Sequence, residues 1–149
     1  MEKHIFNAEK KYKEGLEALK TGLFKWNKDY ASAAMAFDDA VKLYKLAKDS
    51  QGAVKTYYKL IECNDKLNDH WSLAKNHENI ILLAMEDPTL KISDKQILDL
   101  TEKAALYFKG ANSSNNYFLL AQKVCKYFEK KGDFENAIAL YEQAFIEME

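Results

Sequence analysis

Small and apolar residues recur along this chain with the periodicity of an amphipathic helix. In six successive segments, the positions four, eight and eleven residues after a Ser or Asp are mostly small or apolar, as at Ala33, Phe37 and Ala40. At about 100° per residue, these offsets fall on one stripe of a helix. The preceding Ser and Asp residues are good helix N-caps. Consecutive caps lie 20, 20, 24, 20 and 20 residues apart, at Asp29, Asp49, Asp69, Ser93, Ser113 and Asp133.

The regular spacing predicts a helical repeat of about 16 residues plus a four-residue turn. A further segment, from about Lys3 to Leu19, precedes the first cap and carries its own apolar stripe. Gly110 and Gly132 are expected to end helices, and Pro88 is expected to force the one longer connection. The sequence therefore predicts an all-α fold, a right-handed α-α superhelix (a tetratricopeptide-like solenoid) of about seven antiparallel helices. The domain expected is a single one over residues 1–149. The other five predicted stripes are Ala53/Tyr57/Leu60, Leu73/His77/Ile80, Ile97/Thr101/Ala104, Tyr117/Ala121/Val124 and Ala137/Tyr141/Ala144.

Composition agrees with this class and gives an expected compartment. The chain has 149 residues, of which 48% are hydrophobic and 30% charged, with only 5 Gly and 1 Pro. So few turn residues argue against a β-sandwich or barrel. The longest apolar run, residues 80–85, is far too short to cross a bilayer, and the first residues lack the apolar core of a signal peptide. Cys63 and Cys125 stand alone, which favours buried thiols in the cytoplasm.

The sequence offers no recognisable catalytic chemistry, and we expect neither an enzyme nor a bound cofactor or metal. His77-Glu78 begins like a zinc-protease motif, but Ile81 stands where the second histidine belongs. His4, His70 and His77 are better explained as structural or surface residues. All 22 basic residues are lysines, so the arginine fork that reads bases and phosphates is missing. We therefore expect no nucleic-acid partner.

The connection between the first two predicted helices combines apolar and basic residues. Gly22 and the cap Asp29 indicate a loop, yet the segment contains large apolar side chains. Such groups beside lysines are typical of insertion at a lipid headgroup boundary. The alternative is a hydrophobic staple, in which Trp26 packs back onto the helix ends. Packing is the expectation for Trp26, and both alternatives stay open for Leu23 and Phe24. The candidate membrane-contact residues are Leu23, Phe24, Trp26, Lys20, Lys25 and Lys28.

The same segment resembles the soluble NSF attachment protein (SNAP) family, and its gamma branch in particular. The resemblance rests on the Lys-Trp pair at Lys25-Trp26, then Asp29-Tyr30 and the paired alanines Ala33-Ala34. It continues without gaps through Ala36-Phe37, Ala40-Val41, Tyr44 and residues 47–49. By motif it covers about residues 8–66, and by periodicity the whole chain.

The resemblance implies an adaptor of vesicle-mediated, intracellular protein transport and membrane fusion, including ER-Golgi transport. SNAPs are cytoplasmic adaptors, peripheral on vesicle and ER-Golgi membranes. They line the SNARE four-helix bundle and recruit the NSF-type AAA ATPase, which pulls the bundle apart. In the family the loop between the first two helices touches membrane, which here implies Leu23 and Phe24, with Trp26 as a further candidate. The family's ATPase-engaging C-terminal part lies beyond the helices counted here. This chain is therefore expected to be either the N-terminal part of a longer SNAP, which the helical pattern of residues 142–149 favours, or a divergent short protein. It is expected to be unable to stimulate the ATPase by itself.

Exposed lysines are expected to bind an acidic SNARE bundle through many individually weak ion pairs. An alternative is a generic tetratricopeptide-like peptide-binding module that captures a carboxylate, although no Lys or Asn pocket repeats at the cap-plus-four positions. A further alternative, an RNA-binding solenoid, is disfavoured by the missing arginine. The partner-binding candidates are Lys42, Lys45, Lys55, Lys59, Lys123 and Lys126.

Overall fold

The computed structural model describes residues 1–148, which form seven α-helices and one short 3₁₀ helix. The predicted class and number of helices are confirmed for this part of the chain. The 20-residue spacing has a simple origin, since α2 to α6 are each 17 residues long. The elements are α1 (Glu2–Ala18), α2 (Tyr30–Leu46), α3 (Ser50–Lys66), α4 (His70–Glu86), η1 (Pro88–Leu90), α5 (Asp94–Gly110), α6 (Ser114–Lys130) and α7 (Phe134–Met148).

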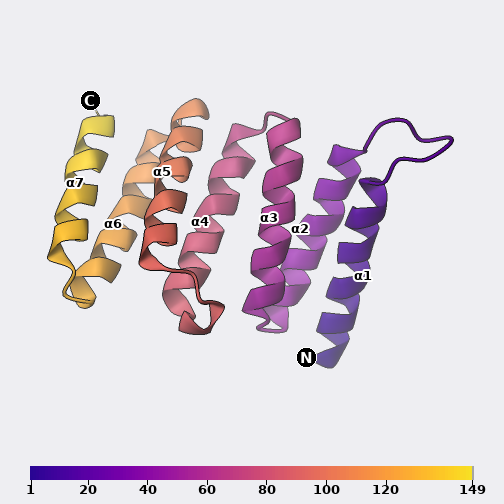
Figure 1. The fold of residues 1–149 in the computed structure, drawn as a ribbon, viewed down its shortest axis with the longest axis horizontal. Coiled ribbons are helices and arrows are strands. Elements are labelled where there is room, and N and C mark those ends of the chain that lie inside the picture. Colours follow the sequence, from indigo (N-terminus) through magenta and orange to yellow (C-terminus); the bar gives the residue numbers. More distant parts are fainter. Residues whose placement is uncertain (149) are drawn as a thin grey trace.

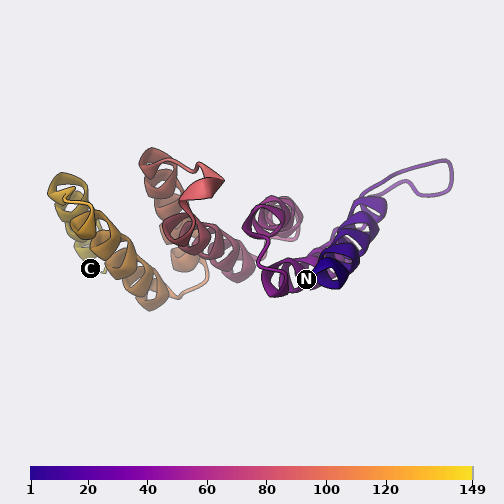
Figure 2. The same ribbon diagram turned by 90° about the horizontal axis from the view of Figure 1, so that it is seen from below.

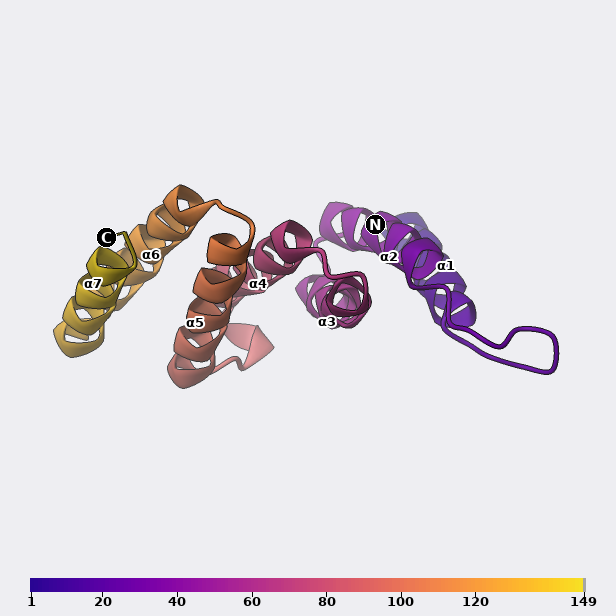
Figure 3. The same ribbon diagram turned by 90° about the horizontal axis from the view of Figure 1, so that it is seen from above.

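The helices stack side by side as an α-α solenoid with two layers. Figure 1 shows the odd-numbered helices in front and the even-numbered helices behind them, with α1 and α7 at opposite ends. The view from below shows the stack curving along its length (Figure 2), and the view from above places α2, α4 and α6 along one side (Figure 3). The closest packing is between helices adjacent in the chain. Each layer therefore presents a face made of alternate helices.

Four of the connections use the same three-residue turn. After α2, the left-handed Lys48 (φ 56°) reverses the chain, and the Asp49 N–H donates to the Tyr44 carbonyl. This Schellman arrangement satisfies the carbonyls left free at the helix end. The same turn follows α3, α5 and α6, with Asn68, Asn112 and Gly132 in the left-handed position.

In three of these turns, the Asp whose N–H completes one helix also caps the next helix with its side chain. Asp49 and Asp69 accept hydrogen bonds from the backbone N–H three residues on (2.9 and 3.1 Å), as predicted, and Asp29, Ser93 and Asp133 do the same. One expectation was wrong, because the Ser113 hydroxyl donates to the Ala111 carbonyl instead of capping α6. Gly110 ends α5 as expected, and Asn112 beyond it takes the left-handed position.

The predicted stripes form the core between the layers. All of their residues on α2 to α6 are buried, together with Ala137 and Ala144 on α7. Tyr141 is the exception, at 38% exposed, because α7 has no further helix beside it among the described residues. On α1, Ala8 is fully buried, while Tyr12 and Leu16 are half-buried for the same reason at the other end of the stack.

Two polar features lie within this core. His77 is 3% exposed, its ring nitrogen Nδ1 lies 2.7 Å from the Leu73 carbonyl, and its ring packs on Tyr107. Asn64 on α3 donates to Asn76 on α4 (2.9 Å), which fixes the register of these two helices. His77 is thus structural, as expected.

The longer connection around Pro88 also follows the prediction. Asp87 is extended and caps η1, accepting hydrogen bonds from the Thr89 N–H (3.0 Å) and its hydroxyl (2.5 Å). These bonds lower the pKa of Asp87. The left-handed Lys91 then leads to the capping box of Ser93 and Gln96.

Candidate functional site

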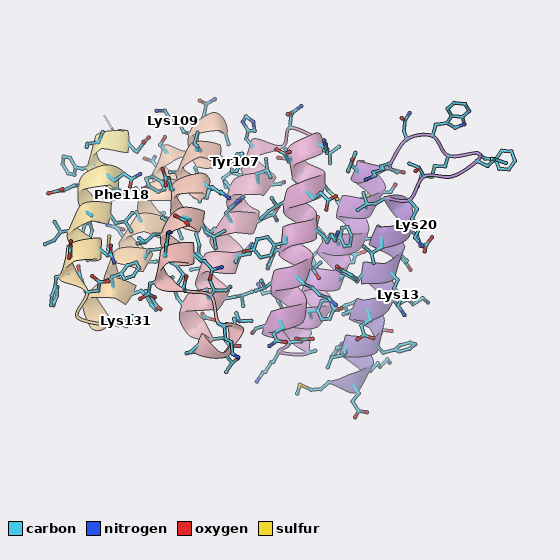
Figure 4. All side chains as sticks on the ribbon, viewed as in Figure 1. Lys13, Lys20, Tyr107, Lys109, Phe118 and Lys131 are labelled. Carbon is cyan, nitrogen blue, oxygen red and sulfur yellow. The ribbon has the colours of Figure 1, made fainter. Side chains whose placement is uncertain are left out.

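The connection between α1 and α2, residues 19–29, projects beyond the helices at one end of the stack (Figure 1). It carries three large apolar side chains that face solvent almost completely. Leu23 is 86% exposed, Phe24 93% and Trp26 85%. The expected packing of Trp26 onto the helix ends is therefore wrong, and for Leu23 and Phe24 the exposed alternative holds. Figure 4 shows side chains of this connection standing clear of the helices, above the labelled Lys20.

The exposed loop is nevertheless held in a defined shape. Gly22 and Lys25 exchange two backbone hydrogen bonds (2.8 and 3.2 Å), which places Leu23 and Phe24 at the tip of a tight turn. At its base, the Asp29 N–H donates to the Ala18 carbonyl (3.0 Å), so the end of α1 and the start of α2 are tied together. The loop thus presents its apolar tip on a closed neck.

Charged groups around the neck strengthen this arrangement. The Lys25 ammonium donates to the Ala18 carbonyl (2.7 Å), at the negative end of the α1 dipole. Lys20 pairs with Glu17 (2.6 Å), where both side chains are exposed. Asp29 accepts from the Ser32 N–H (3.0 Å), and this bond lowers the pKa of Asp29. Lys28 is exposed beside them. The loop therefore combines an apolar tip with a lysine-rich base.

A second candidate surface lies on the even-numbered layer. A groove of about 330 Å³ runs between α2 and α4, lined by Lys42 and Lys45 from α2 and by Trp71 and Lys75 from α4. Asp38 is the acidic residue that lines it. Partial burial raises the pKa of Asp38, an effect that Lys42 opposes.

The neighbouring groove, between α4 and α6, is also lined by lysines. It measures about 370 Å³, with Lys123, Lys126 and Lys130 on one wall and Leu82 and Met85 on the other. The lysines follow one another at spacings of three and four residues, which places them on one face of α6. Four predicted lysines (42, 45, 123 and 126) thus share the even-numbered layer.

The other two predicted lysines lie elsewhere. Lys55 on α3 stands 4.5 Å from the centre of the Tyr12 ring on α1, and Lys59 pairs with Glu62 (3.4 Å). Both belong to the odd-numbered layer and are not brought together with the other four. Sequence reasoning also missed Lys75, Lys130 and Trp71, although the helical spacing of Lys126 and Lys130 was a signal that could have found one of them.

No helix among residues 1–148 is long and apolar enough to span a bilayer. The described features are a stack of antiparallel helices, a lysine-bearing face with two grooves and a projecting apolar loop. Together they define a helical-repeat scaffold of the tetratricopeptide-like class.

Comparison with known proteins identifies the family. The family "Soluble NSF attachment protein, SNAP" matches residues 1–145, so the chain belongs to the SNAP family. It is similar to the gamma-soluble NSF attachment protein of Dictyostelium discoideum, with 32% identity over 101 residues. That match covers 68% of this chain and 30% of the relative, so the matched part spans less than a third of the length of that relative. The predicted resemblance to the gamma branch is confirmed.

Proposed function

We propose that residues 1–149 act as one adaptor domain of vesicle trafficking, which binds assembled SNARE complexes, touches the membrane beside them and helps to recruit an NSF-type AAA ATPase for their disassembly. The observation that carries the proposal is the α1–α2 loop, where Leu23, Phe24 and Trp26 are each at least 85% exposed on a hydrogen-bonded turn. Exposing three large apolar side chains to water does not stabilise the fold, whereas burying them in a lipid surface would be favourable in free energy.

The expected strength of membrane attachment follows from these side chains. Burying an exposed Leu or Phe contributes roughly 1.5–3 kcal/mol, as an upper limit. Each lysine near anionic lipid contributes about 1 kcal/mol. Because the turn is already closed by hydrogen bonds, little new ordering opposes insertion. One copy would bind weakly and reversibly, peripheral to vesicle and ER-Golgi membranes, and several copies on one SNARE bundle would bind far more tightly.

The even-numbered layer is the surface that we propose binds the SNARE bundle. Lysines line both grooves of this face, and SNARE bundles are acidic in general, so the charges are complementary. Exposed pairs of this kind are individually weak, and the contact would rest on many of them. We assign Lys42, Lys45, Lys123 and Lys126 to this face, and Lys75 and Lys130 with them.

Binding to an assembled SNARE bundle tests the proposal. The bundle and an acidic C-terminal peptide are immobilised separately, and the full chain should bind the bundle but not the peptide. The double variant Lys123→Glu with Lys126→Glu should weaken binding, most clearly at low salt. Lys10→Glu with Lys13→Glu on α1 is the charge-matched control and should bind like wild type. Binding to the peptide alone would instead favour the peptide-receptor alternative.

A further inference from the structure

Trp71 occupies an unusual place in the groove between α2 and α4. It lies in the first turn of α4 and is 45% exposed, although its ring is the largest apolar group that lines the groove. The other hydrophobic residues that line the groove, Val41 and Tyr57, are each only 5% exposed. The groove therefore offers one accessible aromatic surface in otherwise polar surroundings.

The fold holds this ring in place. Trp71 packs edge-on against Phe108 of α5, with ring centres 5.9 Å apart and planes at 70°, and Phe108 is fully buried. On the other side, the Lys75 ammonium lies 5.8 Å from the centre of the indole. Lys75 is itself held by Glu78 (2.5 Å). A partner that covers Trp71 would thus meet a preorganised surface and would lose little entropy by ordering it.

The lysines that line the groove with Trp71 favour an acidic partner. Lys42, Lys45 and Lys75 line the same groove as Trp71, together with the partly buried Asp38. We infer that Trp71 is an anchor residue of the partner-binding face, which receives an apolar side chain of an acidic α-helix while these lysines pair with its carboxylates. Residues one helical turn apart share a face, so a single partner helix can supply both. Trp is the residue type most often found at such energetic centres.

This inference rests on the proposed function, because it takes the acidic partner to be a SNARE four-helix bundle. It adds a contact that charge alone does not provide. A contact through lysines weakens steeply as salt screens it, whereas burial of an indole does not. The chain contains 2 tryptophans, Trp71 in the groove and Trp26 in the α1–α2 loop, so the two proposed contacts can be followed separately.

Fluorescence of a single-tryptophan protein tests the inference with the groove intact. The variant Trp26→Phe leaves Trp71 as the only tryptophan of the chain. Addition of an assembled SNARE bundle that contains no tryptophan should shift the Trp71 emission to shorter wavelength and reduce its quenching by acrylamide at least about two-fold. The matched variant Trp71→Phe, which reports from Trp26, should show neither change in the absence of lipid. Unchanged Trp71 emission and quenching at saturating bundle would overturn the inference.

Affinity measurements complete the test. Trp71→Ala should raise the Kd for the bundle at least about five-fold, and the increase should persist at 0.5 M salt. Trp71→Phe, which keeps an aromatic ring against Phe108, should restore most of the affinity and guards against an effect of misfolding. Wild-type binding with an unchanged Kd for Trp71→Ala would overturn this inference alone. A wild-type chain that does not bind the bundle at all would overturn the proposed function, and this inference with it.

Discussion

The α1–α2 and α3–α4 connections join helices of equal length but are built in different ways. Between α3 and α4, Leu67, Asn68 and Asp69 reverse the chain within three residues, and Asp69 both closes one helix and caps the next. Between α1 and α2, residues 19–29 form a projecting turn whose exposed tip is Leu23 and Phe24. Backbone hydrogen bonds join the helix ends in both connections, so the longer connection is as well defined as the shorter one.

The difference distinguishes the turns that are sufficient for helix stacking from a loop that carries exposed apolar side chains. A three-residue turn is sufficient to place neighbouring helices antiparallel, since the same turn occurs after α2, α3, α5 and α6. The additional residues of the α1–α2 loop place apolar groups in water without contributing to the core. The repeat therefore forms the core, and the exposed loop remains available for the membrane contact that we propose.

A buried charge in the repeat should have the largest effect. Ala53 is fully buried on α3, so Ala53→Glu places an unpaired carboxylate in the core and should lower the free energy of unfolding by about 3–5 kcal/mol. The matched loop variant, Leu23→Glu, should leave it within about 0.5 kcal/mol. Urea denaturation measures both. Equal free energies of unfolding for the two variants would contradict the claim that the repeat, and not the loop, stabilises the fold.

A smaller effect should appear on acidification, and it belongs to the repeat alone. Burial lowers the pKa of His77 from its usual 6.5, an effect that the hydrogen bond to Leu73 partly opposes. The unfolded chain then binds a proton below pH 6.5 that the folded chain resists, so stability falls as pH drops from 6.5 toward the lower pKa of the folded state. Urea midpoints between pH 7.5 and 5 should decline less in His77→Gln than in wild type. Identical slopes would mean that His77 is not the group responsible.

Two glycines give the finest comparison. Gly132 has a φ of 77°, so Gly132→Ala should cost about 1 kcal/mol in the α6–α7 turn. Gly22 in the loop has no positive φ, and a Cβ there meets nothing within 4 Å. Gly22→Ala should therefore be neutral or slightly stabilising. Thermal melting of the two single variants provides the measurement, and a larger loss at Gly22 would show that the loop is under strain.

The fold could be predicted largely from the sequence because each repeat carries its own local signals. Asp49 and Asp69 mark helix starts through short-range hydrogen bonds, and stripe residues such as Phe37 are buried by neighbours that follow the same period. The turn details were harder to predict. Lys48 and Asn68 in the left-handed position lack the glycine signal that reveals Gly132.

The candidate site was only partly predictable, because it depends on how separate helices face one another. The loop was recognised from its composition, but the exposure of Trp26 depends on the path of the loop, which projects away from the helices instead of folding back on them (Figure 1). The lysines of the two layers look alike in sequence. Only the stacking order separates Lys42 from Lys55, and only packing on Phe108 places Trp71 in the groove.

Flotation with anionic liposomes, paired with a melting curve, tests the proposal that the tip of the α1–α2 loop inserts into a membrane. The double variant Leu23→Ser with Phe24→Ser removes the exposed tip, and Leu119→Ser on α6, also an exposed leucine (56%), is the control. We expect the double variant to lose flotation while its melting temperature stays within about 1–2 °C of wild type. Unchanged flotation together with a clearly lowered melting temperature would contradict the proposal.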